Sequence, residues 1–293
     1  MSNQSTEQLH EELFGHDHIT VIEPHGNLFE LKLRELWGYK DLILLFVRRD
    51  FVAEYKQTIL GPAWHIIQPL MITIMFTIVF GNIAKLSTDG LPPFLFYMSG
   101  TVIWTYFANV FTEISGTFTK NAGIFGKVYF PRLAIPVSVM ISKLIAFAIQ
   151  FGIFLAFGAY YLVTTNVLVP NGWILLTPLL LLMMGSLALG GGIIISSLTT
   201  RYRDLMVLIG FGVQLLMYAT PVIYPLSSLP EKWQFWAALN PIAPIIEAFR
   251  YAYLGAGTAS WEMLSTSGAT ILAILLLGTL MFNRVERTFM DTV

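Results

Sequence analysis

Long stretches without a charged residue are the strongest constraint on how this 293-residue chain can fold. The stretches cover 28 residues (57–84), 23 residues (90–112), 57 residues (144–200), 26 residues (205–230) and 21 residues (263–283). A helix of about 20 apolar residues crosses the hydrocarbon core of a bilayer. The 57-residue stretch is too long for one crossing, and turn-forming residues between Asn166 and Gly172 divide it. The sequence therefore predicts six membrane-spanning segments.

Backbone polar groups have no water partner inside lipid, so the spanning segments are expected to be helices. We expect an all-α integral membrane protein with six transmembrane helices, at about residues 62–82, 93–114, 134–163, 173–198, 205–223 and 264–283. The composition agrees, because 12% of the residues are charged, about half the share in a soluble protein. A net charge of −1 disfavours nucleic acid as a partner. The lack of cysteine excludes disulfides, thiolate metal sites and cysteine nucleophiles.

Lysine and arginine are distributed unevenly around the predicted spans. Thirteen of the 17 lie before the first span, after the sixth, or in the second-to-third and fourth-to-fifth connections, and three lie on the opposite side. Cytoplasmic connections carry the excess of positive charge, so both termini are predicted to be cytoplasmic. Residues 1–26 are expected to form an acidic cytoplasmic tail. Four of the five histidines lie there, and a solvated tail is favoured over a metal site.

Residues 27–57 have the amphipathic pattern of a helix that lies in the cytoplasmic headgroup layer before the first span. Gly38 is expected to divide this interface helix, and Asp41 is placed to cap its second piece. Aromatic residues alternate with basic residues along it, which suits the boundary between water and lipid. A cytoplasmic helix packed on protein is the alternative interpretation.

The connection between the second and third spans, Lys120 to Arg132, is basic and contains two glycines. Its aromatic and apolar content exceeds what a solvated connector needs. Two interpretations therefore stay open: a positively charged cytoplasmic loop, and a docking element for a cytoplasmic partner.

The connection between the fifth and sixth spans is too apolar for an ordinary loop. Prolines cut it into helices of about ten residues, roughly 15 Å long, which is half the thickness of a bilayer. We predict two short helices within residues 227–255 that re-enter the membrane or lie on it. Glu247 and Arg250 form an i, i+3 pair on the second helix, and a functional and a structural role are equally open for them.

The sequence lacks the features of three functional classes. It contains no glycine-rich phosphate loop of an ATPase. No uncharged stretch holds the carboxylate that ion-coupled carriers place in mid-membrane. An enzyme needs an acid–base or metal cluster at a cavity, whereas the only deep charge is Lys143. We expect Lys143 to reach back toward the cytoplasm, with a polar path as the alternative.

Two stripes of residues mark faces of the predicted spans. Trp104, Phe107 and Phe111 are spaced i, i+3 and i+7, so they share one face deep in the second span. Aromatic rings offer apolar faces to sugar C–H bonds, so this stripe predicts either a polysaccharide path or helix packing. On the fourth span, small residues predict close helix approach; they are Ala188, Gly192 and Ser196.

Six groups of short motifs occur in order on this topology. They are Arg49-Asp50 with Tyr55 to Thr58, Leu60 to Trp64 and Gln68-Pro69; Val128 to Arg132 with Pro136; Arg201 to Asp204; Thr220 to Tyr224; Asn240-Pro241; and Glu247 to Arg250. Together they resemble the membrane subunits of ABC exporters for polysaccharides, the O-antigen and teichoic-acid permease family (Wzm-like). The resemblance covers about residues 19–285, and the acidic, histidine-bearing N-terminal tail is longer than the family pattern.

The resemblance implies an assembly in the bacterial inner (plasma) membrane. Two copies of the chain would form a channel, with ATP and Mg bound by two copies of a separate ATPase subunit. The chain itself would be no enzyme and would bind no cofactor or metal. The cargo would be a polysaccharide on an undecaprenyl-pyrophosphate lipid, moved from the cytoplasmic to the periplasmic side. A permease for small hydrophobic drugs is the first alternative, and a membrane-embedded transferase is the second.

The resemblance also implies roles for particular residues. A coupling helix at 121–130 would contact the ATPase through Asn121, Phe125, Lys127, Tyr129 and Arg132. The sugar path would be lined by aromatic residues, namely Phe76, Trp104, Phe107 and Phe111. Cations at the cytoplasmic interface attract anionic headgroups, so the pyrophosphate candidates are Arg48, Arg49 and Lys56. The positive charge of cytoplasmic segments explains these three residues equally well. Glu247 and Arg250 would belong to a gate.

Overall fold

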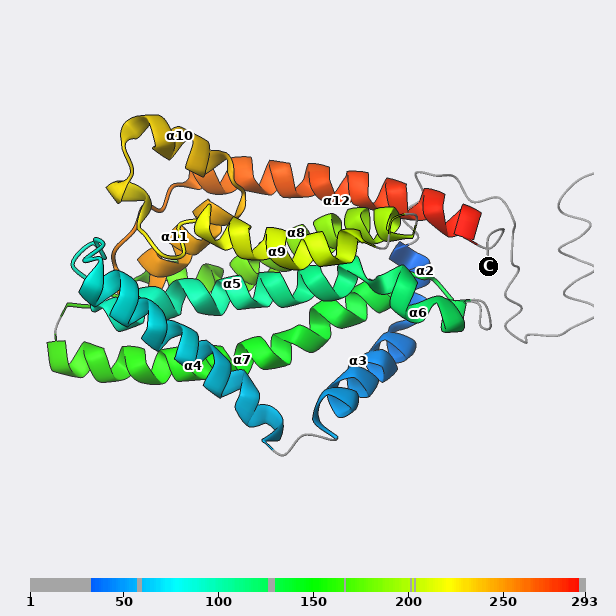
Figure 1. The fold of residues 1–293 in the computed structure, drawn as a ribbon, viewed down its shortest axis with the longest axis horizontal. Helices are drawn as coiled ribbons and strands as arrows, with labels where there is room; N and C mark the ends of the chain where they lie inside the picture. The colour runs from blue at the N-terminus through cyan, green and yellow to red at the C-terminus, as the bar shows by residue number, and fades with distance from the viewer. Residues whose placement is uncertain are drawn as a thin grey trace, which may run out of the picture. The chain divides into compact units, whose positions relative to one another are not determined.

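The computed structural model describes residues 33–56, 60–125, 130–165, 167–200, 202 and 204–289. All of these residues belong to one compact unit, Leu31–Val293. Helices make up the regular structure of the described residues, and no strand occurs among them. The expected all-α class is therefore confirmed. Figure 1 shows the helices in their chain order.

Five apolar helical segments are long enough to cross a membrane. They are α4 (Trp64–Phe76) continued by the π-helix η2 (Thr77–Ile83), α5 (Pro93–Ser115), α7 (Ala134–Thr165), the 3-10 helix η3 (Gly172–Leu176) continued by α8 (Thr177–Thr199), and α12 (Trp261–Phe289). Each lies within a few residues of a predicted span. Five of the six predicted spans thus have full-length helices.

The predicted fifth span, 205–223, is shorter than expected. Its helix, α9 (Leu205–Tyr218), has 14 residues, about 21 Å at 1.5 Å per residue, against about 30 Å of hydrocarbon. Pro221 explains the early end, because proline lacks a backbone N–H and disfavours helical conformation in the residue before it. The count of six full-length spans is not confirmed.

Helix α8 lies between α5 and α12 and packs on both (Figure 1). Glycines allow the close approach. A Cβ atom on Gly278 of α12 would lie 2.5 Å from the backbone oxygen of Gly190, and one on Gly192 would lie 2.8 Å from Ile114 of α5. Ser196 accepts a hydrogen bond from the backbone N–H of Phe118 at 3.2 Å. The close approach predicted for the small-residue stripe is confirmed at Gly192 and Ser196.

The predicted interface helix consists of α2 (Leu33–Gly38) and α3 (Lys40–Tyr55), so the expected break at Gly38 is confirmed. Tyr39 is the N-cap residue of α3, whereas the sequence predicted Asp41. Asp41 lies in the first turn instead, where its negative charge stabilises the helix by interacting with the positive end of the helix dipole. Helix α3 packs mainly on α7, and its buried Phe46 contacts Phe130 with ring centroids 5.6 Å apart.

The helix after α5 begins earlier than the predicted coupling helix at 121–130. Helix α6 (Thr117–Phe125) starts directly after the break at Gly116. Residues 126–129 lie outside the described part of the chain. The ring of Phe118 stacks on Phe282 of α12, with centroids 4.6 Å apart. This contact and the Ser196 hydrogen bond hold α6 against α8 and α12.

Two short helices follow α9, as predicted: α10 (Glu231–Leu239) and α11 (Ile242–Leu254), preceded by the 3-10 turn η4 (Leu226–Ser228). Prolines occupy the N-cap positions of α10 and α11, and Gly255 ends α11 with a left-handed φ of 78°. Helix α11 is almost entirely buried and contacts α5, α8, α12 and η3. Its entry into the membrane stays a prediction.

We predict that Gly278→Ala destabilises the bundle, because the added methyl would meet the backbone of α8. Such overpacking costs about 1–3 kcal/mol, so the thermal unfolding temperature of the purified chain in detergent should fall. Gly268→Ala on the same helix is the matched control, since the nearest atom to its Cβ is Met183 Cε at 3.9 Å. Equal unfolding temperatures for the two variants would contradict the close α8–α12 contact.

Candidate functional site

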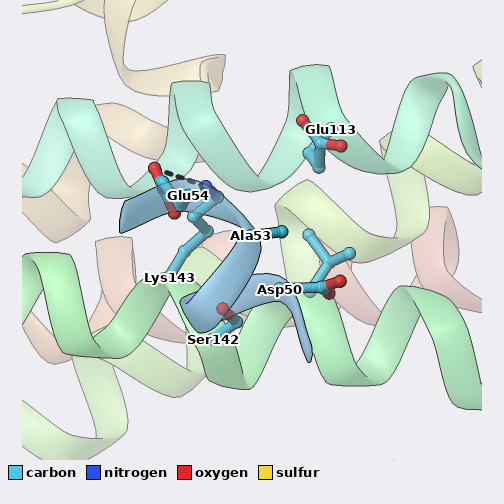
Figure 2. Close-up of a pocket in the computed structure, with 7 residues that line it drawn as sticks. Asp50, Ala53, Glu54, Glu113, Ser142 and Lys143 are labelled. Atoms are coloured by element: carbon cyan, nitrogen blue, oxygen red, sulfur yellow. Dashed lines mark hydrogen bonds and ion pairs between the residues drawn. The ribbon is translucent and has the colours of Figure 1, made fainter. Parts of the chain in front are cut away.

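A polar cleft of about 380 Å³ lies between α3, α5 and α7 (Figure 2). It is lined by Asp50, Ala53 and Glu54 of α3, Glu113 of α5, and Val139, Ser142 and Lys143 of α7. Asp50, Ala53 and Glu54 share one face of α3 because they are spaced i, i+3 and i+4. The lining thus brings three carboxylates, one ammonium group and one hydroxyl together from three separate helices.

Glu54 connects three helices at the cleft. The Nζ atom of Lys143 donates to both of its carboxylate oxygens, at 3.2 and 3.1 Å, as Figure 2 shows. The other neighbour of Glu54 is His65 of α4, whose Nε2 atom lies 3.6 Å from Oε1. Lys143, for which the sequence left cytoplasmic exposure and a polar path open, is therefore held in an ion pair with the interface helix.

The two other carboxylates pair with cations outside the lining. Asp50 lies 2.8 Å from Nη2 of Arg49, and Glu113 lies 2.8 Å from Nζ of Lys120. Both pairs are partly exposed to solvent. Within the described ranges, no group of three histidine or acidic side chains is arranged to hold a metal ion.

The three cations predicted to bind a lipid headgroup do not form one cluster. Arg48 and Lys56 are exposed, and their helical positions direct them away from Asp50 and Glu54. Neither has an ion pair with any other residue that the structure describes. Arg49 pairs with Asp50 beside the cleft, and its guanidinium carbon lies 4.7 Å from the ring centroid of Phe46. Binding of a pyrophosphate headgroup stays a prediction for all three.

The predicted aromatic path divides into two clusters. Along α5, the ring centroids of Trp104 and Phe107 lie 5.4 Å apart, and those of Phe107 and Phe111 lie 5.5 Å apart. Trp104 and Phe107 are buried within the chain. Phe76 lies elsewhere, with its centroid 5.4 Å from Phe80 and 6.2 Å from Tyr97. The sugar path stays a prediction, with helix packing as its alternative.

Arg250 of α11 is buried and bonded on every side of its guanidinium. It donates to the backbone oxygens of Pro221 and Val222 at 2.6 Å each, and to the hydroxyl of Ser99 at 3.3 Å. Its Nη1 atom lies 3.3 Å from Glu247, and its guanidinium carbon lies 3.9 Å from the centroid of Phe96. The sequence identified the Glu247–Arg250 pair but none of these other partners.

Glu247 joins two further segments to the same pair. Its carboxylate accepts hydrogen bonds from the backbone N–H groups of Leu226 at 3.3 Å and Thr258 at 3.1 Å. A Cβ atom on Gly100 of α5 would lie 2.7 Å from Nη2 of Arg250, so a glycine makes room for the guanidinium. The pair cross-links α5, α11 and both flanking loops, and its role in a gate stays a prediction.

The predicted contacts with an ATPase lie at the α6 end of the bundle. The side chain of Asn121 donates to the backbone oxygen of Thr117 at 3.0 Å. Phe125 and Arg132 are buried, and the guanidinium carbon of Arg132 lies 5.4 Å from the Phe125 centroid. Lys127 and Tyr129 lie outside the described residues. Phe125 and Arg132 thus support this end from inside the chain, and the docking role of the whole group stays a prediction.

Sequence reasoning missed the cleft. One sequence signal was available: Asp50 and Glu54 lie on the same face of α3 as the apolar Phe46. An amphipathic helix normally carries its charges on the face opposite the apolar one, so acidic residues beside Phe46 indicate a polar site against the bundle. No sequence signal indicated that Glu113 and Lys143 would join them, since that depends on how α5, α7 and α3 pack together.

We predict that Lys143→Met and Glu54→Gln each loosen α3. Loss of one partner of a partly exposed pair costs about 1 kcal/mol, so amide hydrogen exchange in α3 should be about fivefold faster. Lys232→Met on α10 is the control, because that lysine is exposed and distant from α3 in the chain. Unchanged exchange in both variants would show that the pair does not hold α3.

Arg250→Met is predicted to destabilise the chain by about 3–5 kcal/mol, because it leaves the buried carboxylate of Glu247 without its cation. The double variant Arg250→Met with Glu247→Leu should recover part of this loss, since no uncompensated charge remains. Thermal unfolding in detergent measures both. A double variant less stable than Arg250→Met would show that the carbonyl and N–H partners, and not the charge pair, dominate.

The sequence profile of the family described as ABC-2 type transporter matches residues 41–254. The O-antigen export system permease protein RfbA of Klebsiella pneumoniae is 27% identical over 262 residues, which cover 89% of this chain and 98% of that protein. RfbA of Myxococcus xanthus is 23% identical over 263 residues, with the same coverage. The inner membrane transport permease YadH of Escherichia coli is 22% identical over 275 residues, covering 89% and 97%. The chain therefore belongs to the ABC-2 type transporter family, as a multi-pass membrane protein.

Proposed function

We propose that this chain is the channel-forming subunit of an ATP-driven exporter that moves a lipid-linked polysaccharide of the O-antigen type from the cytoplasm to the periplasm. The observation that carries the proposal is the similarity to two O-antigen export permeases over nearly the whole length of both chains. The lack of a phosphate-binding loop supports a division of labour, with ATP and Mg bound by a partner subunit.

The assembly contains two copies of this chain and two ATPase subunits. Apolar side chains of α9 are exposed in the single chain, among them Val207, Leu208 and Phe211. Helix α9 is also too short to span a bilayer alone. The short length supports a second copy that completes the channel beside α9, and lipid covers the apolar side chains that this copy leaves exposed. The excess of Lys and Arg before the first span and after the sixth supports cytoplasmic termini.

Polysaccharide is favoured over a small hydrophobic drug as the cargo. The two RfbA proteins are named for O-antigen export, whereas the name of YadH specifies no cargo. A transferase is the least favoured alternative. The cleft residues that resemble an acid–base cluster, Glu54 and Lys143, are engaged with each other.

The proposal predicts that the chain co-purifies with its ATPase subunit as a two-plus-two complex when the tag is on this chain alone. Mass photometry measures the stoichiometry, and phosphate release measures ATP hydrolysis. Lipid-linked glycan should stimulate hydrolysis, and small hydrophobic drugs should not. A chain that purifies alone with every candidate ATPase, or a complex that responds to drugs only, would contradict the proposal.

The aromatic path is tested by Trp104→Ala with Phe107→Ala. Export of long glycans, counted per folded complex in the membrane, should fall because sugar rings lose their stacking surface. Tyr106→Ala is the matched control, since Tyr106 is equally buried on α5 but contacts Phe147 of α7 at 5.8 Å between centroids. Equal losses in the two variants would assign the effect to helix packing.

A further inference from the structure

Ser142 differs from most serine and threonine side chains on the described helices. Those hydroxyls donate to a backbone oxygen of the preceding turn, as Ser138 does to Ile135 at 2.8 Å. The Ser142 hydroxyl makes no hydrogen bond with any residue that the structure describes, although Ser142 is only 6% exposed. It lines the cleft (Figure 2). The residue is buried, but its hydroxyl oxygen is not among the fully enclosed polar atoms that lack a partner, so the hydroxyl is open to the cleft. It is therefore able to donate to and accept from a molecule that enters the cleft.

The charges around Ser142 exclude two kinds of ligand. A phosphate or other anion would approach Asp50, Glu54 and Glu113 with Lys143 as the only cation of the lining, and Lys143 is already bound to Glu54. A metal ion would meet the ammonium group of Lys143 in the same cleft. No metal-binding group of acidic and histidine residues occurs among the described residues. Each of the three carboxylates already has a cationic partner, namely Arg49 for Asp50, Lys143 for Glu54 and Lys120 for Glu113, so an organic cation is disfavoured as well. The remaining class is a neutral ligand that forms many hydrogen bonds.

A sugar ring has the chemistry that the lining offers. Carboxylate oxygens of Asp50 and Glu113 accept hydrogen bonds from hydroxyl groups, and such charge-assisted bonds are stronger than neutral ones. The Ser142 hydroxyl both donates and accepts. Ala53 and Val139 add an apolar surface for ring C–H groups. The volume of about 380 Å³ lies at the small end for ligand sites, so it suits a short unit and not a long chain.

We propose that the cleft between α3, α5 and α7 binds a single sugar unit through Ser142, Asp50 and Glu113. The inference rests on the proposed function, in which the sugar is part of the exported glycan. Glu113 lies two residues before the end of α5, and Ser142 lies eight residues after the start of α7. The cleft is thus at the end of the bundle where the interface helix packs, which the charge distribution assigns to the cytoplasm. A sugar headgroup of a membrane glycolipid presents the same chemistry.

The test is binding of methyl glycosides to the full chain in nanodiscs of phosphatidylethanolamine and phosphatidylglycerol, which contain no sugar. Saturation-transfer NMR with methyl glucoside, galactoside, mannoside and N-acetylglucosaminide measures it. At least one glycoside should bind, and Ser142→Val and Glu113→Gln should weaken it about tenfold. Lys120→Met is the matched control, because it removes the outer partner of Glu113 without changing the lining. Circular dichroism and unfolding temperature establish that each variant is folded.

Three results overturn the inference. The first is that no glycoside binds the wild-type chain. The second is that the cleft binds Mg²⁺, with binding lost in Glu113→Gln, or inorganic phosphate, with binding lost in Lys143→Met, while glycosides do not compete. Glycoside binding that Ser142→Val and Glu113→Gln leave unchanged places the sugar outside the cleft and overturns it as well.

Export by the same variants separates the two sources of sugar. Loss of glycoside binding with reduced export of glycan assigns the sugar to the cargo, whereas the same loss with normal export assigns it to a membrane glycolipid. The inference and the proposed function also fail separately. An active glycan exporter whose cleft binds no glycoside retains the proposed function, and a glycoside-binding chain that moves no glycan retains the cleft.

Discussion

Inside a membrane, every backbone carbonyl needs a hydrogen-bond donor from the protein, because no water is available. Pro221 and Val222 follow the early end of α9, so their carbonyl groups have no donor within that helix. The carbonyl groups there leave the helix and receive the guanidinium of Arg250 instead, at 2.6 Å each. Glu247 balances the charge and accepts from two further backbone N–H groups. One buried cation therefore replaces the helical donors that these two carbonyl groups lose where α9 ends.

Helix α5 connects this buried pair to the polar cleft. Ser99 and Gly100 near its start make the hydrogen bond and the space for Arg250. Glu113 near its end lines the cleft. Ser99 and Glu113 are 14 positions apart, which corresponds to about 21 Å of helix. Helix α8 packs closely on α5 between these points, with Gly185 against Tyr106 and Gly191 against Phe111.

The interface helix α3 has two faces with different surroundings. Its inner face carries Phe46 into the core and Asp50 and Glu54 into the cleft, while Arg48 and Lys56 remain exposed. The ion pair of Glu54 with Lys143 fastens this helix to α7. The exposed cations and the cleft residues therefore lie on opposite faces of one helix.

The sequence by itself determined the helical class, five full-length spans, the division of the interface helix at Gly38 and the Glu247–Arg250 pair, because runs of apolar residues and i, i+3 spacing are local properties. Only the tertiary structure decided that Phe76 lies apart from Trp104, that Arg250 binds the carbonyls of Pro221 and Val222, and that Glu54 and Lys143 meet across 89 residues. These outcomes depend on which helix faces pack together, and no spacing along one helix encodes the neighbours of that helix.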